Sequence, residues 1–89
     1  MINLSAFKFE RIEVSNKPKG LSVTAERVFI TVEGECRYRY DDQADPTYTE
    51  GHLLRDGSYL VLNGEVQIKS FRAISTTNDS CVLQISFER

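Results

Sequence analysis

Hydrophobic and polar residues alternate over much of the chain, and this period of two is typical of β-strands that bury one face. The clearest run closes the sequence: every second residue from Cys81 to Phe87 is apolar, and the residues between them are mostly polar. Residues 28–33 alternate in the same way and place Phe29 opposite the apolar face. Both runs predict strands that line a core.

Two other runs alternate over shorter or less regular stretches. In residues 36–40 a cysteine and two tyrosines share one face, while Arg37 and Arg39 share the other. Near the start of the chain the apolar phase shifts between Phe9 and Ile12, which predicts a β-bulge rather than a helix. We therefore expect a strand in each stretch, the first of them irregular.

Turn signals divide the middle of the chain into short elements. An Asp-Gly and an Asn-Gly dipeptide bracket a strand at residues 58–62, because both dipeptides favour positive φ. The spacing of apolar residues beyond it indicates one helical turn near residues 65–70 and then a strand at residues 71–75. The polar residues 76–80 are expected to form the last hairpin loop.

Strand-sized runs thus recur at short intervals, without a helix of about ten residues or more. We expect one all-β domain over residues 1–89, a small antiparallel β-sandwich (jelly-roll-like) or barrel with seven or eight short strands and at most one helical turn. The alternation also leaves Phe29, with Leu60 and Leu62 or their neighbours, on the face away from the main core. Such a second apolar face predicts a homo-oligomer.

Charge and hydropathy exclude some classes of partner. The chain has 89 residues with 11 Lys+Arg against 13 Asp+Glu, a formal net charge of −2. Nucleic-acid binding draws its affinity mainly from Lys and Arg on phosphates, so this balance argues against a nucleic-acid binder. The apolar runs are too short for a signal sequence or a membrane-spanning helix, so we expect a chain in the reducing cytoplasm without a membrane partner.

The residues that commonly carry chemistry are scattered. Cys36 and Cys81 stand 45 positions apart at apolar phases of predicted strands, so we expect small buried hydrophobes, with a disulfide between neighbouring strands as the alternative. His52 is the single histidine, too few imidazoles for a zinc or iron site, and no nucleophile motif or phosphate-binding glycine loop accompanies it. We predict no catalytic residue, cofactor or metal ligand, and hence no enzyme.

The stretch between the second and third runs holds the remaining candidates. The loop from Asp41 to Glu50 is acidic but lacks the spacing of a calcium-binding EF-hand, so its carboxylates are expected in solvent, with a loosely held Ca²⁺ as the alternative. Outward arginines are common at interfaces. The residues we assign to a possible interface are Arg37, Arg39, Phe29 and Tyr48. The alternative function is a binding module for a sugar or other small ligand that uses rim aromatics, Tyr38, Tyr40, Tyr48 and Tyr59, with the acidic loop.

From Gly20 onward the order of motifs resembles that of small proteins encoded in the head and tail gene clusters of tailed bacteriophages and prophages. The stretches that carry the resemblance are GLSV, ERVFITVEGECRYRYDD, PTYTEGHLL, DGSYLVLNG, FRAIS and CVLQISFER. In this chain Gln43 and Ala44 follow the aspartate pair, where the family pattern has a tight Asp-Gly turn. The resemblance implies a virion structural or accessory protein of the head or head-tail region. Such a protein resides in the host cytoplasm during assembly and then in the virion, in contact with other virion proteins and without catalysis.

Overall fold

The most regular alternating runs form the centre of a four-stranded antiparallel sheet. In the computed structural model, which describes residues 4–77 and 79–89, β7 (Cys81–Glu88) lies between β1 (Ala6–Val14) and β2 (Arg27–Glu33). β5 (Tyr59–Asn63) completes the sheet on the far side of β2. Alternate residues of β2 and β7 are buried because one face of this sheet covers the core.

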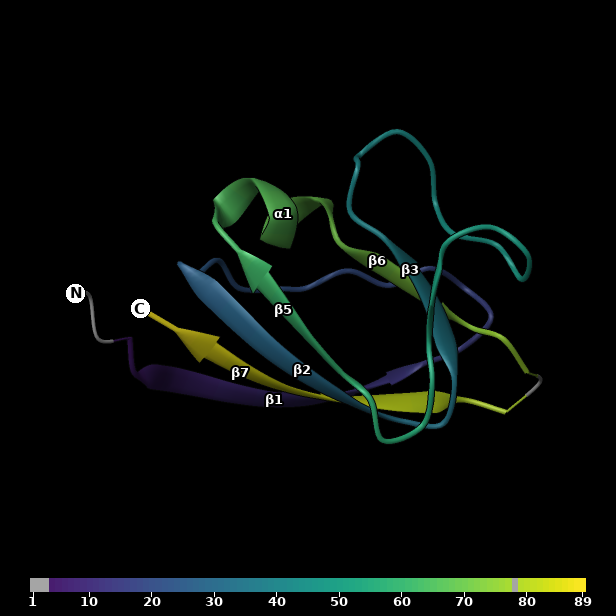
Figure 1. Ribbon diagram of the computed structural model, residues 1–89, viewed down its shortest axis with the longest axis horizontal. Coiled ribbons are helices and arrows are strands. Elements are labelled where there is room, and N and C mark those ends of the chain that lie inside the picture. The colour runs from purple at the N-terminus through teal and green to yellow at the C-terminus, as the bar shows by residue number, and fades with distance from the viewer. Residues whose placement is uncertain (1–3, 78) are drawn as a thin grey trace.

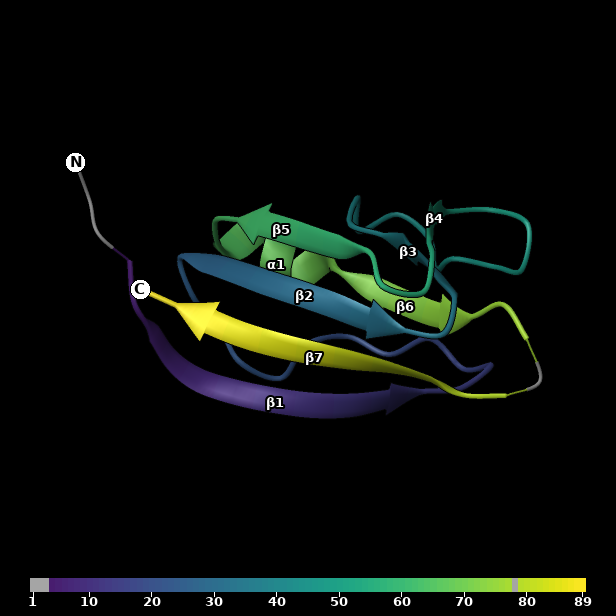
Figure 2. The same ribbon diagram turned by 60° about the horizontal axis from the view of Figure 1, so that its bottom comes forward.

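A smaller sheet covers that core from the other side (Figures 1 and 2). Its order is β4 (His52–Leu54), β3 (Cys36–Arg39) and β6 (Arg72–Ser75), and α1 (Glu65–Ser70) is a single short helix before β6. The core cluster draws on both sheets and on α1. The fully buried large side chains include Phe71, Phe87, Ile30, Leu62, Ile68, Leu83 and Ile85. The predicted all-β sandwich with seven strands and one helical turn is therefore confirmed for the described residues.

Most connections cross from one sheet to the other. β2 leads to β3, β4 to β5, β5 through α1 to β6, and β6 to β7, and each of these steps changes sheet. Only β3 and β4 are consecutive neighbours within one sheet, at least among the residues described. The predicted hairpin at residues 76–80 is wrong, because β6 pairs with β3 whereas β7 pairs with β1 and β2. Residue 78 of that stretch lies outside the described residues.

The irregularity of β1 lies nearer to its start than the sequence indicated. The register between β1 and β7 shifts between Ala6 and Lys8, and from Lys8 to Val14 the pairing is continuous. Phe9 therefore faces outward and Ile12 inward as ordinary alternating residues, and the predicted bulge between these two is wrong. Lys8 and Glu10 occupy inward positions near the sheet edge and form an ion pair there. Because these two inward residues are polar, the alternation of apolar residues is interrupted in the sequence although the strand itself is regular there.

The two ends of the described chain meet beside β1 and β7. The backbone N–H of Ser5 donates to the carbonyl oxygen of Arg89 at 3.3 Å, and the N–H of Arg89 donates to the carbonyl oxygen of Ser5 at 3.1 Å. The guanidinium carbon of Arg89 lies 4.1 Å from the centre of the Phe7 ring, a cation–π contact. Figures 1 and 2 show the two ends on the same side of the sandwich.

Candidate functional site

The outer face of the four-stranded sheet carries an apolar row that runs across all four strands. Cross-strand pairing aligns Phe9 of β1 with Ser86 of β7, Ser86 with Phe29 of β2, and Phe29 with Val61 of β5. Tyr59, two residues before Val61, stacks on Phe29 with ring centres 5.7 Å apart. We call Phe9, Phe29, Tyr59 and Val61 the apolar row. Phe9 is 61% exposed and Tyr59 is 67% exposed, so the row faces solvent.

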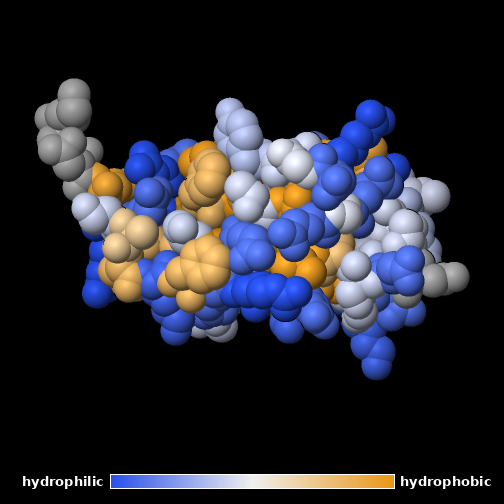
Figure 3. All heavy atoms as spheres, turned by 90° about the horizontal axis from the view of Figure 1, so that it is seen from below, coloured by the Kyte–Doolittle hydropathy of each residue, from blue (hydrophilic) through white to orange (hydrophobic). Residues whose placement is uncertain are grey.

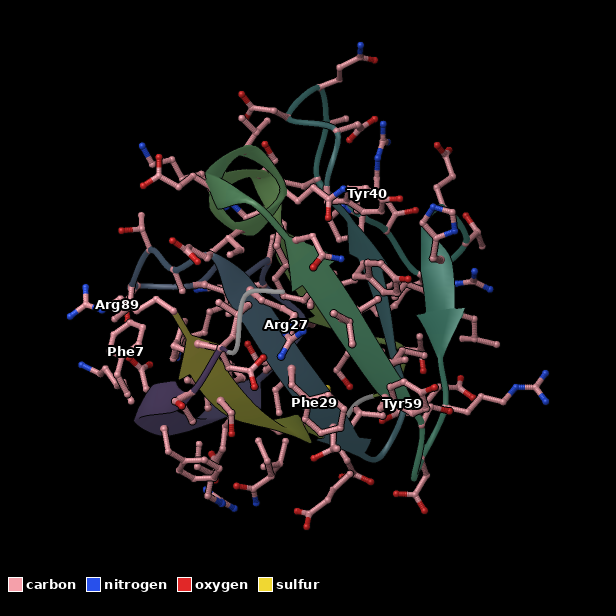
Figure 4. All side chains as sticks on the ribbon, turned by 60° about the vertical axis from the view of Figure 1, so that its left-hand side comes forward. Phe7, Arg27, Phe29, Tyr40, Tyr59 and Arg89 are labelled. Atoms are coloured by element: carbon pink, nitrogen blue, oxygen red, sulfur yellow. The ribbon has the colours of Figure 1, made fainter. Side chains whose placement is uncertain are left out.

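Charged pairs border the apolar row at both sides. On the side nearer the chain ends, Arg27 and Glu88 form the cross-strand pair next to Phe29 and Ser86 on this face. The Nε of Arg27 donates a hydrogen bond to the Glu88 carboxylate, and this bond raises the pKa of Arg27. Arg11 and Glu13 pair at 3.5 Å on the opposite side. Figure 3 shows hydrophobic atoms gathered in the half of this face nearer the chain ends, with hydrophilic atoms around and beyond them. In Figure 4 the rings of Phe29 and Tyr59 lie side by side.

The sequence left open whether Leu60 and Leu62 or their neighbours lie on this outer face, and the structure places the neighbours there. Leu62 aligns with Val28, and Leu60 with Ile30, so both leucines share the core face of the sheet. Leu62 is fully buried, and Leu60 packs against the core cluster. Their neighbours Tyr59 and Val61 face outward instead.

Arg37, an expected interface residue, holds the loop between β3 and β4. Its Nε donates to the carbonyl oxygen of Tyr48 and one Nη donates to that of Gly51, both at 2.9 Å. The Thr47 hydroxyl accepts from the N–H of Glu50 at 3.0 Å, and the N–H of Thr47 donates to the carbonyl oxygen of Glu50 at 2.8 Å. The loop is thus a hydrogen-bonded turn, and the Arg37 side chain binds within its own chain.

Arg39 forms an ion pair with Asp41 at the end of β3. Two guanidinium nitrogens of Arg39 donate to the two carboxylate oxygens of Asp41, which is the bidentate geometry of a strong pair. These hydrogen bonds lower the pKa of Asp41 and raise that of Arg39. The four expected interface residues therefore do not share one surface, because Phe29 lies on the larger sheet and the other three lie on β3 or its loop. Tyr48 is half exposed on that loop.

Aromatic rings stack from the core to the surface at the same end of β3. Tyr38 lies 5.8 Å from Phe71, which is buried, and 5.3 Å from His52, measured between ring centres. Tyr40 continues the stack, 6.3 Å from Tyr38 and 6.2 Å from His52. Burial raises the pKa of Tyr38. The expected group of four rim tyrosines is divided, since Tyr59 belongs to the apolar row on the other sheet.

Two adjoining hollows lie beside this stack. One has a volume of about 290 Å³ and is lined by Arg39, Tyr40, Asp41 and His52. The other has a volume of about 420 Å³ and is lined by Arg39, Asp41, Glu50, Gly51 and His52. Three lining residues are common to both, so we treat them together as the His52 hollow. The alternative binding module named Tyr40 and the acidic loop, which both line this hollow, but its other lining residues Arg39 and His52 were not grouped with them, because that grouping depends on how the loop folds back over the end of β3.

Cys36 and Cys81 meet in the core between the two sheets. Both side chains are buried and both thiols are free. A hydrogen bond to Cys81, together with burial, raises the pKa of Cys36. Buried thiols of this kind are unreactive small hydrophobes, which agrees with the sequence prediction.

Within residues 4–77 and 79–89, no three His, Cys, Asp or Glu residues gather as ligands for a metal ion. The one helix described there, α1, is too short to cross a bilayer.

No protein-family model, curated protein or solved structure matches the chain.

Proposed function

We propose that the protein acts by protein–protein assembly, as a structural or accessory component of a bacteriophage or prophage virion. The observation that carries the proposal is the apolar row, which exposes three aromatic rings and a valine on the outer face of the larger sheet. The motif order of the sequence supports the virion setting. The apolar row and the His52 hollow contain no recognised nucleophile–base pair, which favours contact over catalysis.

The exposed area of the row suits a protein interface. With Phe7 beside it, the row presents roughly 400–500 Å² of apolar surface, from the usual size of aromatic side chains. That is within the range of about 300–600 Å² found for the largest patch on a monomer, which is often functional.

A second copy of the chain is the partner that this face fits best. Arg27 and Glu88 border the row on one side, while Glu33 lies beyond Thr31 on the other. When the two apolar rows meet with the strands of the copies antiparallel, the Arg27 side chain of one copy lies near Glu33 of the other. A copy in the same direction would set Glu33 near Glu33, and like charges oppose that arrangement.

Size-exclusion chromatography with light scattering over a concentration series tests the self-association. We expect the wild type to form a symmetric oligomer and Phe9→Glu to shift it to monomer, because a carboxylate would be buried in the apolar contact. Val66→Glu is the matched control, since Val66 is 79% exposed on α1 rather than on the outer face. A monodisperse wild-type monomer at every concentration would contradict the second copy as partner.

Mass spectrometry of purified particles tests the virion setting separately. In a bacterial strain that carries the gene, the prophage is induced, and the released phage particles are purified by density-gradient centrifugation. The protein should be present in particles at a fixed ratio to the other structural proteins. Its presence in the lysate but absence from the particles would refute the virion assignment, whatever the oligomeric state.

A further inference from the structure

The His52 hollow combines an exposed ring with hydrogen-bonding groups. Tyr40 is 41% exposed and lines the hollow beside His52, and its ring stacks with that of Tyr38 at 6.3 Å between ring centres. A ring fixed at the surface by stacking offers a flat apolar face without much loss of side-chain entropy. Such a platform suits a ligand that is itself flat and apolar on one side.

The polar groups of the hollow offer both donors and acceptors. Arg39 uses two of its nitrogens on Asp41, and a guanidinium has five N–H donors in total. The carboxylates of Asp41 and Glu50 have further lone pairs, since a carboxylate accepts about four hydrogen bonds. Groups that both donate and accept, such as neighbouring hydroxyls, match this mixture.

The loop that carries these groups is fixed in place before any ligand binds. Arg37 binds two of its carbonyl oxygens, and the turn from Thr47 to Glu50 is closed by backbone and side-chain hydrogen bonds. Pro46 is buried, and a Cβ added at Gly51 would lie only 3.2 Å from the Pro46 Cβ, so the loop packs closely. A preformed site loses less entropy on binding than a mobile one.

We propose that the His52 hollow binds a neutral sugar, with Tyr40 as the stacking platform and Arg39, Asp41 and Glu50 as hydrogen-bonding groups. One face of a pyranose ring is made of C–H groups that stack on an aromatic ring, and its hydroxyls both donate and accept. The carboxylates of Asp41 and Glu50 disfavour an anion, and because Arg39 is already paired with Asp41, the choice of a sugar rests on the mixture of donors and acceptors beside the Tyr40 ring rather than on net charge. The two parts of the His52 hollow, about 290 and 420 Å³, are near the lower end of the roughly 300–1,000 Å³ that is typical of ligand sites. This size suits one or two sugar rings.

Amide NMR spectra of the wild-type protein test the site directly. Glucose, galactose, mannose and N-acetylglucosamine are titrated separately to high millimolar concentration, with tetramethylammonium chloride and sodium phosphate as the cation and anion probes. We expect at least one sugar to shift the signals of residues 39–41 and 50–52, with little effect of either salt. If no sugar shifts these signals, or if a salt shifts them and the sugars do not, the proposal is overturned.

Matched tyrosine variants then locate the binding. Tyr40→Ala should weaken the sugar affinity about tenfold, the loss of one stacking partner. Tyr59→Ala removes a ring from the other sheet that is more exposed than Tyr40, 67% against 41%, and should leave the affinity unchanged. Equal sugar affinity in Tyr40→Ala and the wild type would overturn the assignment. If Tyr40→Ala does not fold, Glu50→Gln keeps the shape of the hollow and should still weaken binding.

The sugar site and the self-association fail or succeed independently. Phe9→Glu alters the apolar row on the larger sheet, whereas the hollow lies at the end of β3 in the smaller sheet. We expect that variant to retain the sugar shifts of the wild type. Loss of sugar binding in Phe9→Glu, with the fold intact, would show that the hollow is not an autonomous site.

Discussion

The side chain of Arg37 on β3 binds the carbonyl oxygen of Gly51, the residue immediately before β4, at 2.9 Å. A strand residue thereby fixes the far end of the loop that follows its own strand. The loop between these residues contains Glu50 and is also bound by Arg37 at Tyr48. The position of the His52 hollow thus depends on an arginine that does not line it.

Replacement of Arg37 should loosen this loop. In Arg37→Ala both carbonyl oxygens lose a charged donor, and we expect the free energy of unfolding to fall by about 1–3 kcal/mol. Urea unfolding measures the change, and Arg55→Ala, at an exposed arginine, is the control that should lie within about 0.5 kcal/mol of the wild type. Equal stability of the two variants would mean that the loop does not need Arg37.

Gly34 and Gly57 differ in their surroundings although both have positive φ. A Cβ at Gly34, where φ is 93°, would lie 3.1 Å from the Cys81 Cβ, whereas around Gly57, where φ is 82°, no described atom is within 4 Å. Gly57→Ala should cost about 1–2 kcal/mol from the backbone alone. Gly34→Ala should cost about 1 kcal/mol more because the close contact adds strain. Thermal or urea unfolding of the pair measures this difference, and equal losses would contradict it.

The two core thiols should resist alkylation in the folded protein. Both side chains are buried, so iodoacetamide cannot reach either sulfur, and the hydrogen bond to Cys81 together with burial also raises the pKa of Cys36. We expect iodoacetamide to modify neither cysteine near neutral pH until denaturant unfolds the chain, and then to modify both together. Mass spectrometry across a urea series follows the modification. Modification of one cysteine in the absence of urea would show that the sandwich opens at that strand.

Ionisation of Tyr38 should destabilise the protein at alkaline pH. Burial raises the pKa of Tyr38 above its ordinary value of 10.0, so its contribution is complete below pH 10.0 and is lost as the pH rises through the folded-state pKa. Tyr38→Phe has no proton to lose there. Its urea midpoint should fall less than that of the wild type between neutral pH and a pH above 10.0. Parallel falls in the two proteins would contradict this assignment.

The sequence was informative where a strand has one buried face. The alternation from Cys81 to Phe87 and in residues 28–33 predicted both central strands, because each side chain there reports the face it occupies. The helical turn at residues 65–70 was also placed correctly from its apolar spacing. These features are local, so they appear in the order of residues.

Strand pairing and the loop over β3 depend on distant residues and were not predicted. Alternation does not say which sheet a strand joins, so residues 76–80 suggested a hairpin although the chain changes sheets there. The outward position was left open between Leu60 and its neighbours for the same reason, since the face that each occupies is set by pairing with β2. The role of Arg37 needed the folded positions of two carbonyl oxygens on the loop.

The pairing of β7 determines when the larger sheet can form during synthesis. Among the described strands, β7 is the last to be synthesised, and it alone joins β1 to β2. Until residues 81–88 emerge, β1 has no strand partner, and the core faces of both β1 and β2 stay open to solvent or to a chaperone. We therefore expect the larger sheet to form only after residues 81–88 are made, and a ribosome stalled before Cys81 to hold a chain that exposes the hydrophobic residues of β1 and β2.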